Sequence, residues 1–134
     1  MPLYKHELTI GENQKFIDIT EQVQEDINNS KTKEGIVVIY CPHTTAGITI
    51  NENADPDVCK DILYGYEKSF PTNDVNYKHY EGNSHAHMKS SLVGPSQTLI
   101  ISKGDLILGT WQGVYFCEFD GPRKRKYYVK VISD

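Results

Sequence analysis

Three of the five histidines in this 134-residue chain fall within nine positions, together with other polar side chains: His79, Glu81, Asn83, His85, His87 and Lys89. Histidine exchanges a proton near neutral pH more readily than any other side chain, and it is the commonest metal ligand in proteins. The density of such groups predicts a functional site, either catalytic or metal-binding. The alternative is a solvated histidine cluster without a role.

The spacing of His85 and His87 limits which histidines act together. Residues two apart share one face of a strand and can chelate one ion, whereas on a helix they diverge by about 200°. Asn83 or Ser84 can cap a short helix that carries both histidines, and we favour this helix. It predicts that His87 approaches His79 and that His85 points elsewhere.

A second polar stretch follows the end of a predicted strand, with His43, Thr44 and Thr45 in sequence and Asn51 and Glu52 a little further on. An imidazole beside hydroxyls and backbone N–H groups suits an oxyanion or a phosphate. The threonines could equally belong to a polar turn, and Asn51 could be a turn former only. Glu52 has no such structural explanation and is a candidate general base.

A third stretch places Trp111 and Gln112 between Gly109 and Gly113. Two glycines inside strand sequence indicate a bulge or a close backbone approach. This makes Trp111 and Gln112 candidates for substrate contacts, although the single tryptophan could equally be a core residue.

A basic run at 123–126 resembles a nucleic-acid patch, but the net charge of -4 and the sequence pI of about 5.7 argue against that partner. We interpret the run as a hairpin tip with solvated charges. Arg123 remains a candidate because a guanidinium is well suited to phosphate. The longest mostly apolar run, at 35–40, is too short to span a bilayer, and the N-terminus lacks a signal-peptide pattern. We therefore expect a cytoplasmic protein that binds neither nucleic acid nor membrane.

The elements that must position these residues predict one α+β domain over residues 1–134, of mainly antiparallel sheet with two or three helices. The expected strands are 3–10, 15–19, 35–41, 45–50, 97–102, 106–110, 114–119 and 126–132, with 35–41 buried on both faces. The expected helices begin at the caps Thr20 and Asp55, the second ending before Pro71, and a third covers 85–92. The dispersed Cys41, Cys59 and Cys117 are expected to be free thiols.

The chain resembles the YjbQ family of small bacterial and archaeal proteins, which are described as secondary thiamine-phosphate synthases. The resemblance rests on four blocks in order, His43-Thr-Thr-Ala-Gly-Ile-Thr-Ile-Asn-Glu52 with Asp55-Pro-Asp-Val58, His79-Tyr-Glu-Gly-Asn83 with Ala86-His87, Leu108-Gly-Thr-Trp-Gln112, and Glu118-Phe-Asp-Gly-Pro-Arg123. It implies an antiparallel α+β fold, a homotrimer with polar pockets near subunit contacts, and an ability to make thiamine phosphate.

Such an enzyme couples a pyrimidine diphosphate to a thiazole phosphate and releases diphosphate, so its site needs cations or N–H donors for the leaving group, often with a metal. We expect His43, Glu52, His79 and His87 to be catalytic. We expect phosphorylated substrates to be bound by Thr44, Thr45, Asn51, Asn83, Lys89, Trp111, Gln112 and Arg123. A divalent metal, Zn²⁺ or Mg²⁺, would be held by His43, His79 and His87. The alternatives are a metal-assisted hydrolase or phosphatase with Glu52 as base, and a non-catalytic trimer that binds a metal or a metabolite.

Overall fold

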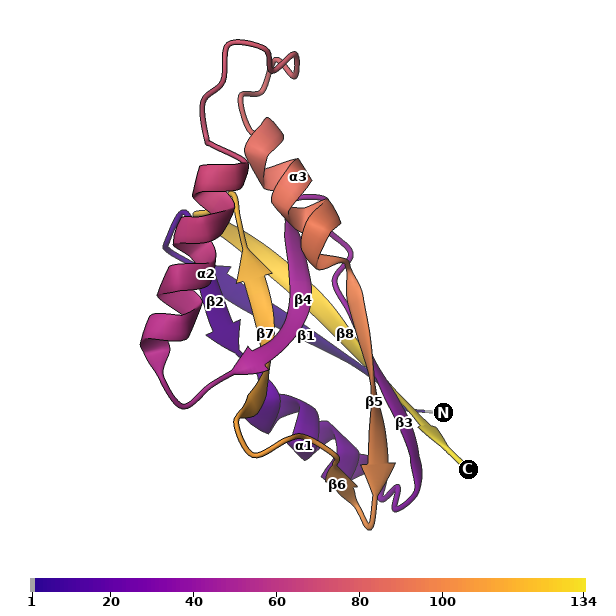
Figure 1. The fold of residues 1–134 in the computed structure, drawn as a ribbon. Coiled ribbons are helices and arrows are strands. Elements are labelled where there is room, and N and C mark those ends of the chain that lie inside the picture. The colour runs from indigo at the N-terminus through magenta and orange to yellow at the C-terminus, as the bar shows by residue number, and fades with distance from the viewer. Residues whose placement is uncertain (1) are drawn as a thin grey trace.

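The structure, a computed structural model, describes residues 2–134, and in this range two antiparallel sheets and three helices form the fold (Figure 1). The five-stranded sheet has the order β1 (Leu3–Ile10), β8 (Arg123–Ser133), β3 (Gly35–Tyr40), β5 (Ser96–Ser102) and β6 (Asp105–Leu106). The three-stranded sheet has the order β2 (Lys15–Asp18), β7 (Gln112–Glu118) and β4 (Ala46–Glu52). The helices are α1 (Thr20–Ser30), α2 (Pro56–Ser69) and α3 (Ser84–Val93). The predicted single α+β domain is confirmed.

The molecule has two hydrophobic clusters because the three-stranded sheet is covered on both faces. One face packs against the inner face of the five-stranded sheet and against α1, and this cluster contains Val23, Val37, Ile48, Phe116 and Val129, all of them fully buried. The other face carries Phe16, Tyr115, Cys117 and Phe119, which pack against α2 and α3. The chain is therefore layered as sheet, sheet and helices, with β7 in the middle.

The prediction that strand 35–41 is buried on both faces is wrong. In β3 the alternate residues Val37 and Ile39 are fully buried, whereas Ile36 and Tyr40 are 37% and 44% exposed. A run of apolar β-branched residues does not reveal whether the second face is covered. The strand that is buried on both faces is β7, whose residues from Gly113 to Glu118 are all buried.

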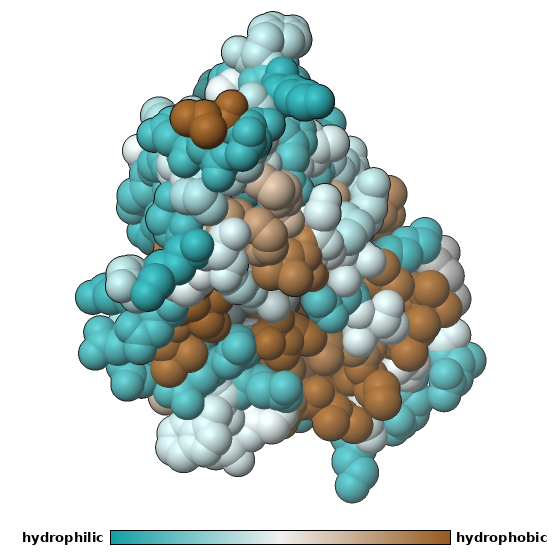
Figure 2. Space-filling view, turned by 45° about the horizontal axis from the view of Figure 1, so that its top comes forward, coloured by the Kyte–Doolittle hydropathy of each residue, from teal (hydrophilic) through white to brown (hydrophobic). Residues whose placement is uncertain are grey.

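The uncovered face of the five-stranded sheet carries apolar side chains on neighbouring strands. Ile36 lies opposite Ile100 of β5 and Ile132 of β8, and these two are 57% and 38% exposed. Ile107, just after β6, is 53% exposed. In the view of Figure 2, exposed apolar side chains gather in the lower half of the molecule. We call the set Ile36, Ile100, Ile107 and Ile132 the outer isoleucine surface.

Several local predictions are confirmed. The side chain of Asp55 caps α2 by accepting a hydrogen bond from the Asp57 N–H at 2.9 Å, and Lys103 and Gly104 turn the chain between β5 and β6 with φ of 53° and 83°. The three cysteines are free. Within residues 2–134 the helices are too short or too polar to cross a membrane.

Two local predictions are wrong. Thr20 does not cap α1 through its own side chain, because its hydroxyl donates to Asp18 at 2.6 Å and accepts from the Val114 N–H at 2.8 Å. The strand expected at 106–110 ends at Leu106.

Candidate functional site

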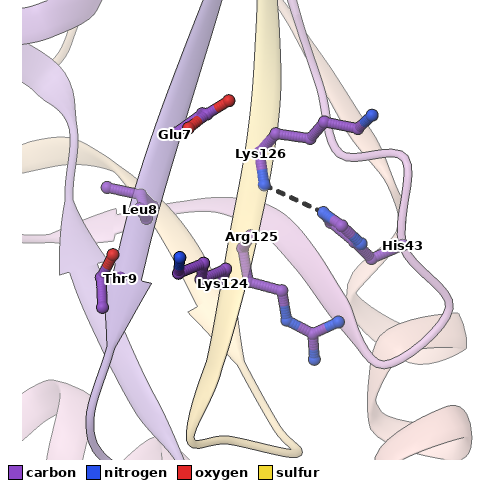
Figure 3. Close-up of a pocket in the computed structure, with 7 residues that line it drawn as sticks. All are labelled: Glu7, Leu8, Thr9, His43, Lys124, Arg125 and Lys126. Carbon is purple, nitrogen blue, oxygen red and sulfur yellow. Dashed lines mark hydrogen bonds between the residues drawn. The ribbon is translucent and has the colours of Figure 1, made fainter.

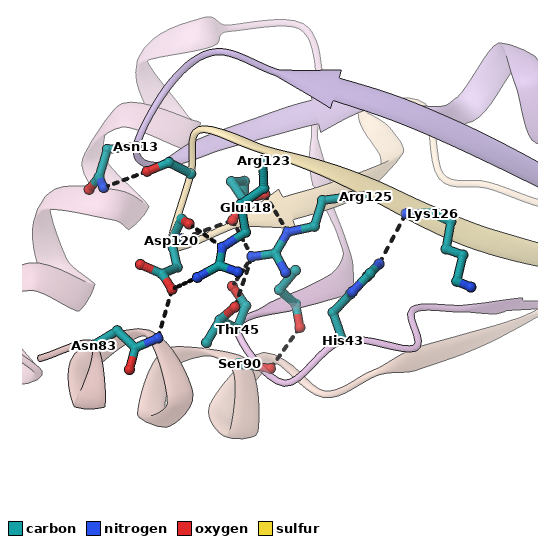
Figure 4. Close-up of polar contacts among 12 residues, drawn as sticks. Asn13, His43, Thr45, Asn83, Ser90, Glu118, Asp120, Arg123, Arg125 and Lys126 are labelled. Carbon is teal, nitrogen blue, oxygen red and sulfur yellow. Dashed lines mark hydrogen bonds and ion pairs between the residues drawn. The ribbon is translucent and has the colours of Figure 1, made fainter. Parts of the chain in front are cut away.

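A polar pocket of about 400 Å³ lies where the ends of several elements meet, and it unites seven of the twelve predicted site residues. Its walls come from the loop after β3, the loop before α3, α3 itself and the first residues of β8 (Figure 4). The predicted residues in it are His43, Thr44, Thr45, His79, Asn83, His87 and Arg123. Pro42, Glu81 and Arg125 also line it. None of these three was predicted to be catalytic or to bind substrate, although Glu81 belongs to the polar cluster that predicted the site. We call this cavity the histidine–arginine pocket.

The loop after β3 is fixed from both sides. The Cys41 N–H donates to the Pro95 carbonyl at 2.7 Å, and the Phe119 N–H donates to the Thr45 carbonyl at 3.2 Å. From α3, the Ser90 hydroxyl donates to the Ala46 carbonyl at 2.7 Å. These bonds attach the loop to α3 and to the strand ends, so its side chains reach the pocket from a rigid base.

A buried ion pair between Arg125 and Glu118 forms the floor of the pocket. The Arg125 Nε lies 2.7 Å from Glu118 Oε1, and its Nη2 lies 2.5 Å from Oε2. The same Nη2 donates to the Thr45 hydroxyl at 2.8 Å. Both charged side chains are almost fully buried. Because Arg125 belongs to one sheet and Glu118 to the other, the pair joins the two sheets beneath the site.

The interpretation of 123–126 as a solvated hairpin tip is therefore wrong for Arg125. The burial of β8 alternates, with Arg125, Tyr127, Val129 and Val131 all on the buried face. This period of two is visible in the sequence and would have assigned Arg125 to the core side. Arg123 lies beyond the covered region and pairs with Asp120 at 2.7 Å, with its side chain 48% exposed.

His43 is held as a neutral acceptor at one wall. Its Nε2 accepts a hydrogen bond from the Lys126 N–H at 3.0 Å (Figure 3), which leaves Nδ1 as the nitrogen that carries the proton. Burial lowers the pKa of His43, and the neighbouring Arg125 charge lowers it further. His43 also lines a second cavity of about 300 Å³ on the side of Lys124 and Lys126. The imidazole of His43 therefore lies between two cavities that are both lined by basic side chains.

The predicted arrangement of the other histidines is confirmed. The rings of His79 and His87 lie 5.3 Å apart between centroids, nearly perpendicular at 84°. His85 is buried, and its Nδ1 lies 2.9 Å from the Lys89 ammonium. The helix separates the two neighbours, as residues two apart on a helix must.

The structure does not bring Lys89 into the histidine–arginine pocket. Its side chain is fully buried and its ammonium lies 2.7 Å from Glu67, which ties α3 to α2. Burial opposes ionisation of Glu67, but hydrogen bonds from Lys89 and Thr72 prevail and lower its pKa to about 2. Lys89 is thus a buried partner of a carboxylate, and nothing in one chain lets it reach a substrate in the pocket.

Asn83 offers an unused hydrogen-bond acceptor. Its Nδ2 donates to Asp120 at 2.7 Å, and the same carboxylate oxygen accepts from Arg123. A carboxylate only accepts hydrogen bonds, so the amide of Asn83 must direct its Nδ2 rather than its Oδ1 toward Asp120. Among the described residues the Oδ1 of Asn83 is the one buried side-chain nitrogen or oxygen without a partner. A donor on a bound ligand would satisfy it.

Four other predicted residues lie outside the pocket in a single chain: Asn51, Glu52, Trp111 and Gln112. Glu52 pairs with Gln112 at the far end of β4 and β7, about 20 Å along the strand from Ala46 at 3.3 Å per residue. Trp111 is 62% exposed and is not a core residue. The motif from His43 to Glu52 is continuous in sequence, but an extended strand carries its two ends apart.

One chain does not assemble the predicted three-histidine metal site. Between residues 2 and 134 no three His, Cys, Asp or Glu side chains have the geometry to hold an ion. His79 and His87 meet, but the Nε2 of His43 is occupied by the backbone of Lys126. The residues fit Mg²⁺ better than Zn²⁺, because Mg²⁺ binds through one or two carboxylates and substrate phosphates, and Glu81 lines the pocket.

Two stacked antiparallel sheets, a helical layer and a polar pocket lined by histidines and arginines define a small α+β protein. A family model described as UPF0047 protein YjbQ-like matches residues 5–134, and the chain belongs to this family. It is 55% identical over 132 residues to UPF0047 protein MJ1081 of Methanocaldococcus jannaschii, covering 98% of this chain and 95% of that protein. It is 56% identical over 119 residues to UPF0047 protein YugU of Bacillus subtilis, covering 89% and 90%.

Solved structures share the fold. An uncharacterised YjbQ/UPF0047 protein from Clostridium acetobutylicum is 56% identical with a TM-score of 0.94, covering 96% of this chain and 99% of that one. A YbjQ-like protein of unknown function from Sulfolobus solfataricus is 29% identical with a TM-score of 0.95, covering 99% and 97%. The layered architecture is therefore a property of the family at low sequence identity.

The ion pair predicts an asymmetric response to substitution. We expect Arg125→Met to lower the free energy of unfolding by about 3–5 kcal/mol, because it leaves Glu118 charged and buried. Arg125→Met combined with Glu118→Leu should recover most of this loss. The control Arg123→Met removes a half-exposed pair and should cost at most about 1 kcal/mol. Urea denaturation measures all three, and equal costs for the two single variants would contradict the role given to Arg125.

The lowered pKa of His43 predicts a loss of stability in acid. The unfolded chain has the ordinary histidine pKa of 6.5, so it takes up a proton before the folded chain does. The stability that depends on neutral His43 is full above that pH and is lost as the pH falls through the lower folded pKa. Unfolding free energies of His43→Asn should fall less than those of the unaltered protein between about pH 6.5 and pH 5. An identical decline in both proteins would exclude His43 as a cause.

Proposed function

We propose that this protein is a transferase of the thiamine-phosphate synthase type, which couples a pyrimidine diphosphate to a thiazole phosphate and releases diphosphate. The observation that carries the proposal is the histidine–arginine pocket, which gathers three imidazoles and two guanidinium groups from separate segments. Such a set of donors suits a phosphorylated small molecule whose charge grows as the bond breaks.

In this reaction, covalent bonds form and break only between the two substrates and not with the protein. The thiazole nitrogen forms a bond to the methylene carbon of the pyrimidine, and the bond from that carbon to the diphosphate oxygen breaks with its electron pair. Arg123 and the N–H donors of His43, His79 and His87 would stabilise the departing diphosphate. Arg125 is already neutralised by Glu118, so its part is to hold Thr45 and the pocket wall in place.

The unpaired oxygen of Asn83 would fix the substrate's orientation. It is a buried acceptor at the pocket, and an amino group on a pyrimidine ring is a matching donor. A Mg²⁺ ion bound with the diphosphate would add charge stabilisation, with Glu81 as the nearest carboxylate of the pocket for it to use. These two contacts distinguish a pyrimidine diphosphate from inorganic phosphate.

The alternatives have less support. A hydrolase with Glu52 as base would need this carboxylate in the pocket, but it lies at the far end of β4. A non-catalytic trimer that binds a metal or metabolite would use the same pocket without turnover, so only an assay separates it from the transferase.

We also propose that the protein is a cytoplasmic homotrimer. The outer isoleucine surface supports self-association, since neighbouring exposed apolar side chains on a sheet are commonly covered by another copy. The cavity of about 300 Å³ beside His43 is lined by residues of β1 and β8, so a subunit contact there would adjoin the site.

Replacing His87 with Ala tests the function. We expect loss of thiamine-phosphate formation, with the free energy of unfolding changed by no more than about 1 kcal/mol, the scale of a non-core substitution. The control Tyr64→Ala alters a side chain on α2 that is 66% exposed and should leave both properties intact. Product formation and thermal melting are measured on the same preparations. A destabilised His87→Ala protein with full activity would refute the proposed site.

Replacing Ile100 with Asp tests the assembly. A charge at the centre of the outer isoleucine surface should convert a trimer to monomers at micromolar concentration, because burying it against a second copy is costly. The control Val75→Asp places the same charge on a loop residue that is 99% exposed. Light scattering gives the mass of each protein. A monomeric unaltered protein, or a trimer that tolerates Ile100→Asp, would contradict this part of the proposal.

A further inference from the structure

A further cavity, separate from the histidine–arginine pocket and from the cavity beside His43, lies between α2 and the strands β2 and β7. Its volume is about 460 Å³, within the range of small-molecule sites. Phe16, Tyr115, Leu63 and Cys59 line its interior. The rings of Phe16 and Tyr115 lie 5.9 Å apart and are tilted by 44°, so they form an aromatic wall. We call this cavity the α2 pocket.

The packing of α2 is incomplete over this cavity. The helix has apolar residues on one arc, yet none of its 14 residues is fully buried. Cys59, Ile62, Leu63 and Tyr66 pack only partly against the second hydrophobic cluster. An amphipathic helix normally buries its apolar stripe. Here two residues of the stripe, Cys59 and Leu63, line a cavity that an apolar ligand can fill.

The charged residues at the rim balance in number, with Glu12 and Asp18 negative and Lys15 and Lys60 positive. Lys15 lies 2.9 Å from Glu12. Asp18 accepts hydrogen bonds from Thr20 and from the Asn53 amide. The rim therefore carries no net charge that would attract an ion, in contrast to the histidine–arginine pocket.

We propose that the α2 pocket is a binding site for a small, uncharged, planar aromatic molecule. The aromatic wall selects a flat apolar ring, since offset and edge contacts between rings are favourable. Because the charges at the rim balance, a charged ligand would lose its hydration without gaining an opposite charge in exchange, and its binding is disfavoured. The site does not depend on the proposed transferase activity.

Cys59 provides a direct probe of this site. It is the half-buried cysteine of the chain, whereas Cys41 and Cys117 are 1% and 0% exposed. Burial raises the pKa of both buried thiols, that of Cys41 to about 11. Iodoacetamide should therefore modify the native protein at Cys59, and Cys59→Ser should leave it unmodified.

The experiment uses the full chain with prodan, an uncharged naphthalene dye whose emission reports polarity. We expect a saturable blue shift of the dye and at least a tenfold slower alkylation of Cys59 when the dye is saturating. Leu63→Trp, which fills the cavity, should weaken dye binding at least tenfold. The control Tyr64→Trp adds the same ring on the exposed face of α2, where Tyr64 is 66% exposed, and should bind dye normally.

Three results of the dye experiments would overturn the proposal. They are the lack of a saturable blue shift, dye binding that leaves the alkylation rate unchanged, and dye binding unaffected by filling the cavity. Alkylation that is slow without dye and accelerates on dilution would show that a second copy covers the pocket, which also refutes it. If Leu63→Trp does not fold, Cys59→Phe fills the same cavity from one helical turn earlier in α2, and the protection measurement on the unaltered protein decides independently.

Discussion

The buried ion pair between Arg125 and Glu118 joins the two sheets at the end where the polar residues gather. Each sheet supplies one charge, and burying either charge without the other would strongly destabilise the folded protein. The guanidinium also donates a hydrogen bond to the Thr45 hydroxyl. Burial lowers the pKa of His43, and the charge of Arg125 lowers it further. The ion pair therefore contributes to the alignment of the sheets, to the position of the loop after β3 and to the neutral state of its histidine.

This constraint explains how a small chain keeps many polar groups close together. The base of the histidine–arginine pocket is satisfied internally by Glu118, Asp120 and backbone carbonyls, so it is rigid before any ligand binds. The groups that remain able to contact a ligand are the imidazoles, the free oxygen of Asn83 and the half-exposed guanidinium of Arg123, which is paired with Asp120 on one side only. A rigid floor with unused donors and an unused acceptor is the kind of preorganisation that stabilises developing charge.

Local signals in the sequence predicted the fold class, the capped helix α2, the turn at Lys103 and Gly104, and the separation of His85 from His87. Each of these depends on residues within one turn or one hairpin. The prediction failed where the answer depends on what covers a strand. β3 and β7 are both apolar, and only the stacking of a second sheet and two helices buries both faces of β7.

In the site, too, predictions from local sequence succeeded and predictions that depend on tertiary packing failed. Residues of the loops and of α3 were found because polar side chains there have no structural explanation, whereas Arg125 was missed because its basic neighbours are solvated. Glu52 was grouped with His43 by closeness in sequence, which an extended strand does not preserve. Whether another subunit brings Glu52 or Trp111 to a pocket depends on an assembly that no pattern within one chain encodes.

Calorimetric titration with inorganic diphosphate tests whether the histidine–arginine pocket binds a diphosphate group. We expect saturable binding that Arg123→Met weakens at least tenfold, which corresponds to about 1.4 kcal/mol. Lys68→Met, which removes the same charge from the exposed side of α2, should bind as the unaltered protein does. Equal affinities for all three proteins would show that the diphosphate is held elsewhere or by net charge alone, and would contradict the account.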